Sequence, residues 1–297
     1  MMNRLVFTST IVLLFTACQQ STSEKQAATQ EIVSEKPTVT LKEVWSSDTT
    51  LRTPECVIYD KPNDVLYVSN INENPWEKDG NGFISRLSTN GEVLELKWVE
   101  GLHGPKGMAL KDNSLFVNDM DELVEINTST GEIINRTVVT DENCRLNDAT
   151  IGDDGTLYIS GSGNQTVYQV KDGTIDTLIS GDLGRPNGLL ALGNQLLILG
   201  NVDTTIKSLN LKTMELKQVH EGIARGDGIV PTGKGGYIVT NWLGEIHHVT
   251  ADWKSTKLLD SKAQNIYTAD IDYIKELDLL LVPTFFDNRV VAYSLFK

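Results

Sequence analysis

Basic residues are scarce in this chain of 297 residues, in which 26 Lys and Arg stand against 40 Asp and Glu for a formal net charge of −14. An acidic surface repels phosphate backbones and anionic lipid headgroups, so we expect no nucleic-acid partner. The same acidity also serves simple solubility and identifies no ligand by itself. With 40% hydrophobic residues the chain can bury one sizeable core, which predicts one large domain.

Cysteine is almost absent, with three residues in the whole chain. Cys56 and Cys144 are about ninety residues apart and fall in different repeats, described below, so we expect buried free thiols rather than a disulfide. Neither thiol is paired in sequence with a general base that would take up its proton. A nucleophilic or redox cysteine enzyme is therefore not favoured.

The N-terminal apolar run is too short to cross a membrane as an ordinary helix. It follows Arg4, extends from Leu5 to Phe15 and ends in Thr16-Ala17-Cys18, which is typical of an export signal. The string Leu-Phe-Thr-Ala-Cys resembles a bacterial lipobox, which implies cleavage and lipid attachment at Cys18.

We therefore predict a lipoprotein signal peptide over residues 1–18 and, because its polar composition cannot bury a core, a flexible tether over residues 19–37. The protein would be anchored by lipid to the bacterial cell envelope, facing the periplasm or the outer surface, with no other membrane contact. Secretion without a lipid is the alternative.

No window sustains the 3.6-residue apolar period of amphipathic helices, which excludes helical repeats. Instead a short polar string recurs six times, and its successive third residues lie 40 to 51 residues apart. The six strings are Thr53-Pro54-Glu55, Gly104-Pro105-Lys106-Gly107, Arg145-Leu146-Asn147-Asp148, Arg185-Pro186-Asn187-Gly188, Arg225-Gly226-Asp227-Gly228 and Thr268-Ala269-Asp270.

Each string is followed by short apolar or alternating segments that predict four antiparallel strands per repeat. Four strands at a period of about forty residues are typical of a propeller blade, so we predict an all-β, six-bladed β-propeller over residues 38–297. The sixth repeat lacks its outer strand, and we expect Thr38–Val44 to supply it and close the ring. A β-sandwich or an open array is the alternative.

In a propeller the first strand of each blade lies nearest the axis, so the six third residues should meet at one mouth of the central channel. They are all polar: Glu55, Lys106, Asn147, Asn187, Asp227 and Asp270. Pro, Asn, Asp and Gly are also turn formers, and for any single repeat a turn is a sufficient explanation. Six polar residues at one place favour a functional ring instead.

Carboxylates and amide oxygens without histidine or thiolate suit hard divalent cations, so we expect Ca²⁺ first, then Mg²⁺ or Mn²⁺, with Zn²⁺ less suited but open. Clustered carboxylates repel one another, and a bound dication would keep them ionised. Lys106 offers the alternative, because its ammonium could neutralise the ring in place of a metal or bind a substrate oxygen. Asp270, on the same ring, is a second candidate for substrate binding.

Several of these strings resemble the motifs of the SMP-30/gluconolactonase-like family over about residues 40–297: Pro54-Glu55, Arg145-x-Asn147-Asp148, Pro186-Asn187-Gly188-Leu189 and Asp227-Gly228. The resemblance implies that Glu55, Asn187 and Asp227 bind a divalent metal and that Asp227 is also the base that activates water. It further implies that Arg145 and Asn147 contact substrate. The calcium-dependent paraoxonases resemble the chain more distantly.

Two features depart from that family pattern. Arginines stand two residues before the ring position in three successive repeats, at Arg145, Arg185 and Arg225. They predict an anion-binding collar, or alternatively simple solvation and pairing with ring carboxylates. The loops after each second strand should form the rim of the mouth, and they include Asn70–Gly82 with Trp76, Asn118, Asn201, Trp242, Phe285 and Phe286.

These observations together predict a divalent-metal-dependent hydrolase of a small molecule, namely a lactone, an ester or a sugar acid derivative. The alternative is a non-enzymatic propeller on the envelope that binds a ligand or a protein, because a fold does not by itself imply chemistry.

Overall fold

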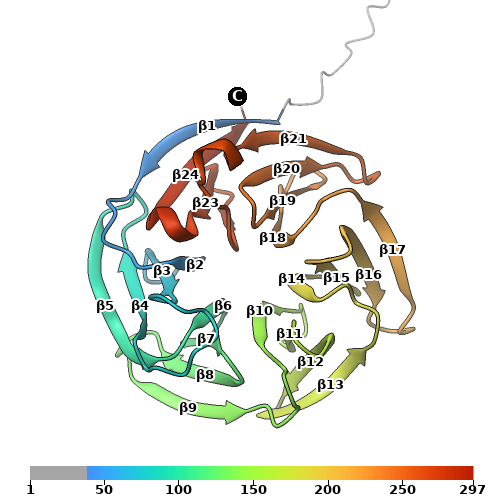
Figure 1. The fold of residues 1–297 in the computed structure, drawn as a ribbon, viewed down its shortest axis with the longest axis horizontal. Helices are drawn as coiled ribbons and strands as arrows, with labels where there is room; N and C mark the ends of the chain where they lie inside the picture. Colours follow the sequence, from blue (N-terminus) through green and yellow to red (C-terminus); the bar gives the residue numbers. More distant parts are fainter. Residues whose placement is uncertain (1–38, 297) are drawn as a thin grey trace, which may run out of the picture. The chain divides into compact units, whose positions relative to one another are not determined.

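The computed structural model describes residues 39–296, which form six four-stranded antiparallel sheets arranged as blades around a central axis (Figure 1). Within this described part of the chain, two short 3₁₀ helices, η1 (Lys262–Gln264) and η2 (Phe285–Asp287), interrupt the strands. The six-bladed all-β propeller predicted from the repeats is thereby confirmed. The predicted signal peptide with Cys18, and the predicted tether, lie outside the described residues.

Each blade has an innermost strand, which in the first five blades begins within a polar string, and a second strand that pairs with it. The innermost strands are β2 (Pro54–Asp60), β6 (Pro105–Lys111), β10 (Leu146–Ile151), β14 (Pro186–Leu192), β18 (Gly226–Pro231) and β22 (Asp272–Ile274). The second strands are β3 (Val65–Asn70), β7 (Ser114–Asp119), β11 (Leu157–Gly161), β15 (Gln195–Gly200), β19 (Tyr237–Asn241) and β23 (Leu279–Pro283).

The third and fourth strands continue each blade outward. The third strands are β4 (Gly82–Leu87), β8 (Glu122–Asn127), β12 (Thr166–Lys171), β16 (Thr205–Asn210), β20 (Glu245–Val249) and β24 (Val290–Phe296). The outermost strands are β5 (Val93–Leu102), β9 (Ile133–Val138), β13 (Thr174–Ser180), β17 (Leu216–Glu221), β21 (Ser255–Asp260) and β1 (Val39–Ser46).

The ring is closed by strand β1, which pairs antiparallel with β24 from Val39 opposite Phe296 to Ser46 opposite Val291 (Figure 1). The two ends of the described chain thus complete one blade, as the missing outer strand of the sixth repeat predicted. Trp45 of β1 also packs against the buried cluster between the sixth and first blades, which includes Leu66 and Leu281. Both backbone pairing between β1 and β24 and the burial of apolar side chains therefore stabilise the closed ring.

Deleting residues 38–46 should expose the edge of β24 and cost the protein its single cooperative unfolding transition. The physical reason is that the last blade loses its fourth strand and Trp45 leaves the adjoining core. Thermal denaturation followed by circular dichroism measures this, with a chain truncated before Lys36 as the control that retains β1. An unchanged melting curve for the deletion would show that the ring closes in another way.

The core consists of the layers between neighbouring blades. One such layer combines Tyr67 and Ile84 of the first blade with Met108 and Val117 of the second, all buried. Cys56 belongs to this layer and Cys144 to the next, and both are buried free thiols, as expected. Burial raises the pKa of both thiols, which makes them poor nucleophiles.

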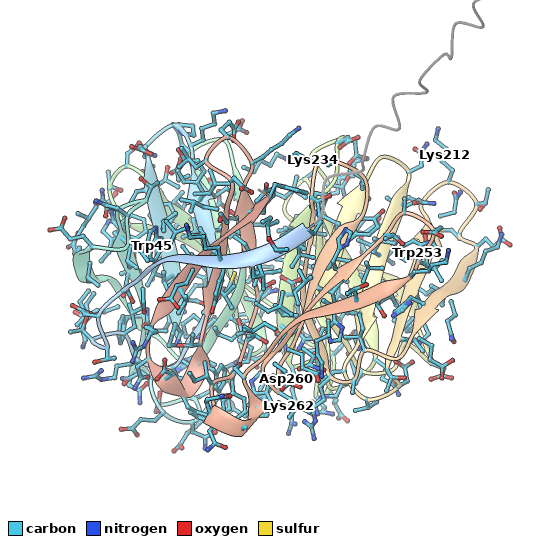
Figure 2. The ribbon with its side chains drawn as sticks, turned by 90° about the horizontal axis from the view of Figure 1, so that it is seen from above. Trp45, Lys212, Lys234, Trp253, Asp260 and Lys262 are labelled. Atoms are coloured by element: carbon cyan, nitrogen blue, oxygen red, sulfur yellow. The ribbon has the colours of Figure 1, made fainter. Side chains whose placement is uncertain are left out.

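The alternation of strand directions gives the propeller two different ends. The innermost strands begin at one end, which we call the site end, and the loops between second and third strands return to it. Figure 2 shows the ring from the side, with Asp260 and Lys262 at the site end and Lys212 and Lys234 at the opposite end. Among residues 39–296 no helix is long and apolar enough to cross a membrane.

Candidate functional site

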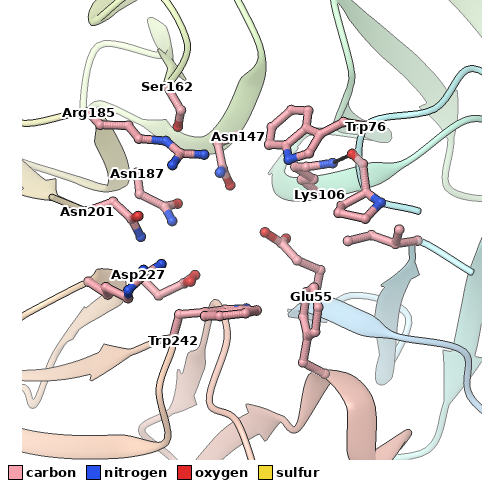
Figure 3. A pocket seen from close by; sticks show the side chains of 14 residues that line it. Glu55, Trp76, Lys106, Asn147, Ser162, Arg185, Asn187, Asn201, Asp227 and Trp242 are labelled. Carbon is pink, nitrogen blue, oxygen red and sulfur yellow. Dashed lines mark hydrogen bonds between the residues drawn. The ribbon is translucent and has the colours of Figure 1, made fainter. Parts of the chain in front are cut away.

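A cavity of about 220 Å³ opens at the site end of the channel, and five of the six predicted ring residues line it. Each is the second residue of its innermost strand, and each is buried; they are Glu55, Lys106, Asn147, Asn187 and Asp227. Figure 3 shows the carboxyl groups of Glu55 and Asp227 and the amide of Asn147 directed into one opening. Because these residues occupy equivalent positions in successive blades, they lie close together in the cavity although they are far apart in the sequence.

Asp270, predicted as a sixth member of the ring and as a substrate ligand, does not line this cavity. Its N–H donates to the Glu55 carbonyl (2.9 Å), and the chain forms a bridge with Cys56 before β22 begins only at Asp272. Its carboxyl group instead hydrogen-bonds to that of Asp148. Both line a separate cavity of about 180 Å³ bounded by later residues of the innermost strands.

Two buried carboxylate oxygens in the site lack any hydrogen-bond partner among the described residues: Glu55 Oε2 and Asp227 Oδ1. The Asn187 side chain hydrogen-bonds to the Asp227 carboxyl group. Burial, and then the charges of neighbouring carboxylates, raise the pKa of Asp227 to about 8 and that of Glu55 well above its usual range. Because orphaned buried carboxylate oxygens are costly, this corner of the cavity favours a proton or a cation.

Lys106 does not form an ion pair with Glu55 within the part of the chain that the structure describes. Its Nζ donates to the carbonyls of Pro75 and Gly104, both at 2.8 Å, and lies 4.2 Å from the centroid of the Trp76 ring. Burial lowers the pKa of Lys106 to about 8. The ammonium therefore secures the loop that carries Trp76, and the free Glu55 oxygen stays available to another cation.

A second repeated position also faces the cavity, and only part of it was predicted. The residue directly after the second strand lines the cavity in four blades: Ile71, Ser162, Asn201 and Trp242. Its N–H donates to the carbonyl two residues before the ring position in each case, at 2.9 to 3.2 Å. Asn201 and Trp242 were predicted at the rim of the mouth, whereas Ser162 and Ile71 were not predicted individually. All four residues follow their second strand at the same offset, and that offset is the signal that could have identified them.

Asn118, expected on the rim, is instead fully buried within β7. Its Nδ2 donates to the carbonyls of Asn147 (3.1 Å) and Asp148 (2.9 Å). The side chain therefore fixes the start of β10 and, through it, the position of Asn147 in the cavity. Asn118 acts on the site through the backbone of a neighbouring blade.

Arg145 lies beside the cavity rather than in its wall. Its Cζ is 5.2 Å from the centroid of the Trp76 ring, and it lines an adjoining surface pocket together with Trp76 and Asp121. Arg185 and Arg225 do line the cavity. A substrate in the cavity would therefore meet Arg185 and Arg225 directly, with Arg145 behind Trp76.

The buried carboxyl groups predict a stability that falls as pH rises. Burial raises the pKa of both Asp227 and Asp270 to about 8 from an ordinary 3.8, so between these values the folded chain holds more protons than the unfolded chain. The free energy of unfolding then decreases by about 1.4 kcal/mol per pH unit for each extra proton. The lowered pKa of Lys106, about 8, acts only above this window.

Melting temperatures measured in a metal chelator should therefore fall between pH 5 and pH 8. Asp270→Asn should flatten that fall, since an amide does not titrate and can still hydrogen-bond to Asp148. Asp153→Asn, an exposed turn residue, is the matched control and should keep the wild-type slope. A melting temperature that rises with pH over this range would contradict the raised pKa values.

Comparison with known proteins adds the fold alone. No protein family model matches this chain, and no curated protein sequence matches it. Solved structures do match: a streptogramin B lyase covers 86% of this chain and 98% of its own at 14% identity with a TM-score of 0.64. A virginiamycin B lyase from Staphylococcus aureus is 15% identical, and the match covers 87% of this chain and 100% of the lyase chain with a TM-score of 0.60.

A chain of a nidogen–laminin complex is also similar, with 19% identity, coverage of 74% of this chain and 84% of its own, and a TM-score of 0.61. At such identities these likenesses establish the architecture and carry no activity with them. The six-bladed propeller therefore rests on the topology and on these neighbours together, while the resemblance to the SMP-30/gluconolactonase-like motifs stays a prediction.

Proposed function

We propose that this propeller is a divalent-metal-dependent hydrolase of a lactone or related ester, acting in the cavity at its site end. The observation that carries the proposal is the pair of orphaned buried oxygens, Glu55 Oε2 and Asp227 Oδ1, in the same cavity as the Asn187 amide. Carboxylate and amide oxygens are the donors that Ca²⁺ prefers, followed by Mg²⁺ and Mn²⁺, with Zn²⁺ a poorer match. The donor set therefore fits the cation.

Glu55, Asn187 and Asp227 would hold the cation, which when bound polarises a substrate carbonyl and stabilises the developing oxyanion. The Asp227 carboxylate would also accept the proton of the attacking water and return it to the departing alkoxide oxygen. A carboxyl pKa near 8 in the cation-free cavity leaves Asp227 able to exchange a proton near neutral pH. Asn147 presents its amide to the same opening and orients a substrate oxygen.

A binding propeller without catalysis is the second candidate. One observation favours it: among residues 39–296 no group of three or more His, Cys, Asp or Glu side chains is placed to share a metal. A site with only two carboxylates would bind a dication less tightly than a site with three. Metal binding therefore discriminates between the two candidates.

The test is calorimetric titration of Ca²⁺ and Mn²⁺ into chelator-treated protein, with hydrolysis of a panel of lactones and aryl esters followed in parallel. The proposal expects one cation per chain and hydrolysis that depends on it. Asp153→Asn, at the opposite end of the ring, removes one exposed carboxylate and should leave both readouts unchanged. Protein that binds neither ion and hydrolyses nothing on the panel would leave the binding propeller as the better account.

A further inference from the structure

Three successive blades place an arginine at the same backbone position of the site end, directly before β10, β14 and β18. Arg145, Arg185 and Arg225 have left-handed φ angles of 47°, 59° and 49°. Their carbonyls accept the backbone N–H groups of Ser162, Asn201 and Trp242 at 3.0, 3.0 and 2.9 Å. The blade geometry imposes this conformation, since Thr53 of the first blade shares it with φ 49°.

A left-handed position favours glycine or asparagine, and an arginine there costs about 1 kcal/mol of backbone strain. The backbone conformation therefore does not explain why these positions are arginine, and the reason must lie in the guanidinium groups. We call Arg145, Arg185 and Arg225 the arginine collar.

The arginine collar has no anionic partner within the described chain. None of its guanidinium groups lies within 4.0 Å of a carboxylate in residues 39–296, whereas Arg136 pairs with Glu122 and Arg289 with Asp287. Burial, and then the charges of Arg145 and Arg225, lower the pKa of Arg185. Arg185 and Arg225 both line the cavity, and an anion bound there would relieve the repulsion among the three guanidinium groups.

Part of the cavity wall is apolar and aromatic, and Arg225 lies next to it, with its Cζ 6.0 Å from the centroid of the Trp242 ring. Ile71, Trp242 and Phe285 line this part, and the Trp242 ring packs against Tyr267 at 4.6 Å and Phe285 at 5.5 Å between centroids. Figure 3 shows Trp242 and Arg185 on opposite sides of the opening, with Asn201 and Asp227 between them. The cavity thus combines two cationic side chains, Arg185 and Arg225, with a rigid apolar wall, and a ligand with an anionic group attached to an apolar body could contact both.

We propose that Arg185 and Arg225 of the arginine collar bind an oxyanion group of the ligand, so that the ligand of this cavity is an amphiphilic organic anion. A carboxylate or phosphate group would lie against Arg185 and Arg225, and an aryl or alkyl body against Trp242 and Phe285. The assignment of this anion as a substrate rests on the proposed ester hydrolysis. Anion binding itself requires no metal and can be measured without one.

The experiment is calorimetric titration of chelator-treated protein with phenyl phosphate, benzoate and the neutral isostere benzamide. The collar predicts that at least one anion binds roughly tenfold or more tightly than benzamide, because a hydrogen bond to a charged group contributes that much. Binding should weaken as NaCl increases. The stronger of the two anions identifies the oxyanion, phosphate or carboxylate.

Arg185→Gln should weaken that anion roughly tenfold or more, and Arg185→Lys should fall between Gln and wild type, since lysine keeps the charge without the bidentate fork. Lys212→Gln removes one positive charge at the opposite end and should change affinity by less than about twofold. Equal melting temperatures verify that Arg185→Gln is folded, and Arg225→Gln takes its place if it is not.

Benzamide binding as tightly as both anions, or full anion affinity in the Arg185→Gln and Arg225→Gln variants, would overturn the collar. Hydrolysis of a neutral lactone without any anion binding would overturn it and leave the metal-dependent hydrolase standing. Anion binding in protein that takes up neither Ca²⁺ nor Mn²⁺ would support the collar and overturn the metal-dependent hydrolase.

Discussion

Asp227→Ala is expected to abolish both dication binding and ester hydrolysis, with a loss of activity of at least about 100-fold. The substitution removes a buried carboxyl group whose Oδ1 has no other partner in the described chain and whose other contact is the Asn187 amide. It therefore deletes a metal-ligand oxygen and the proton acceptor at once. Titration of Ca²⁺ and Mn²⁺, with lactone hydrolysis in parallel, measures the two losses.

Asp227→Asn separates the two roles of the carboxyl group. An amide oxygen still ligates a cation but cannot accept the water proton, so this variant should keep much of its metal affinity and lose activity about as fully as Asp227→Ala. Glu55→Ala and Asn187→Ala should also weaken metal binding, and their effects should not add to that of Asp227→Ala, because all three residues would serve one ion. Unchanged metal binding in Asp227→Ala would sink the metal-hydrolase proposal.

Gly188→Ala is expected to destabilise the protein by about 3 kcal/mol or more, which lowers the melting temperature by on the order of 10 °C. A Cβ at Gly188 would lie 1.8 Å from the backbone carbonyl oxygen of Asp227 in the next blade. Gly188 has no left-handed φ, so its requirement is space between two innermost strands rather than backbone freedom. Backbone cannot move aside as a flexible side chain can.

Gly173→Ala is the matched control for this change. Gly173 has a left-handed φ of 78° but nothing within 4 Å of an added Cβ, so alanine should cost only about 1 kcal/mol there. Thermal unfolding of the two variants decides the comparison. Equal small losses at both positions would show that the innermost strands are not in close contact at the axis.

The fold could be predicted almost entirely from the sequence because its information is local and repeated. Each blade carries its own polar string, its own alternating strands and a period near forty residues, and a single missing strand at one end matched a spare strand at the other. The pairing of β1 with β24 could be predicted from the number of strands in each repeat, because an unpaired strand edge in the sixth blade would be unfavourable.

The site could be predicted only as far as the repeats remain equivalent. Glu55, Asn147, Asn187 and Asp227 line one cavity because each occupies the second position of a regular innermost strand. Asp270 occupies the equivalent sequence position but does not line the cavity. The innermost strand of the sixth blade begins at Asp272, two residues after Asp270 instead of one residue before it, and Asp270 itself forms a bridge with Cys56. A string alignment carries no information about that shift.

The sequence by itself thus determined the six blades, their closure and the convergence of polar residues on one end of the channel, since these depend on periodicity and strand alternation. Tertiary structure alone decided that Lys106 bonds to the carbonyls of Pro75 and Gly104 instead of Glu55. It also decided that the guanidinium groups of the arginine collar have no partner carboxylate within 4.0 Å among the described residues. Side-chain partners depend on distances across blades, and those distances arise only once the ring is closed.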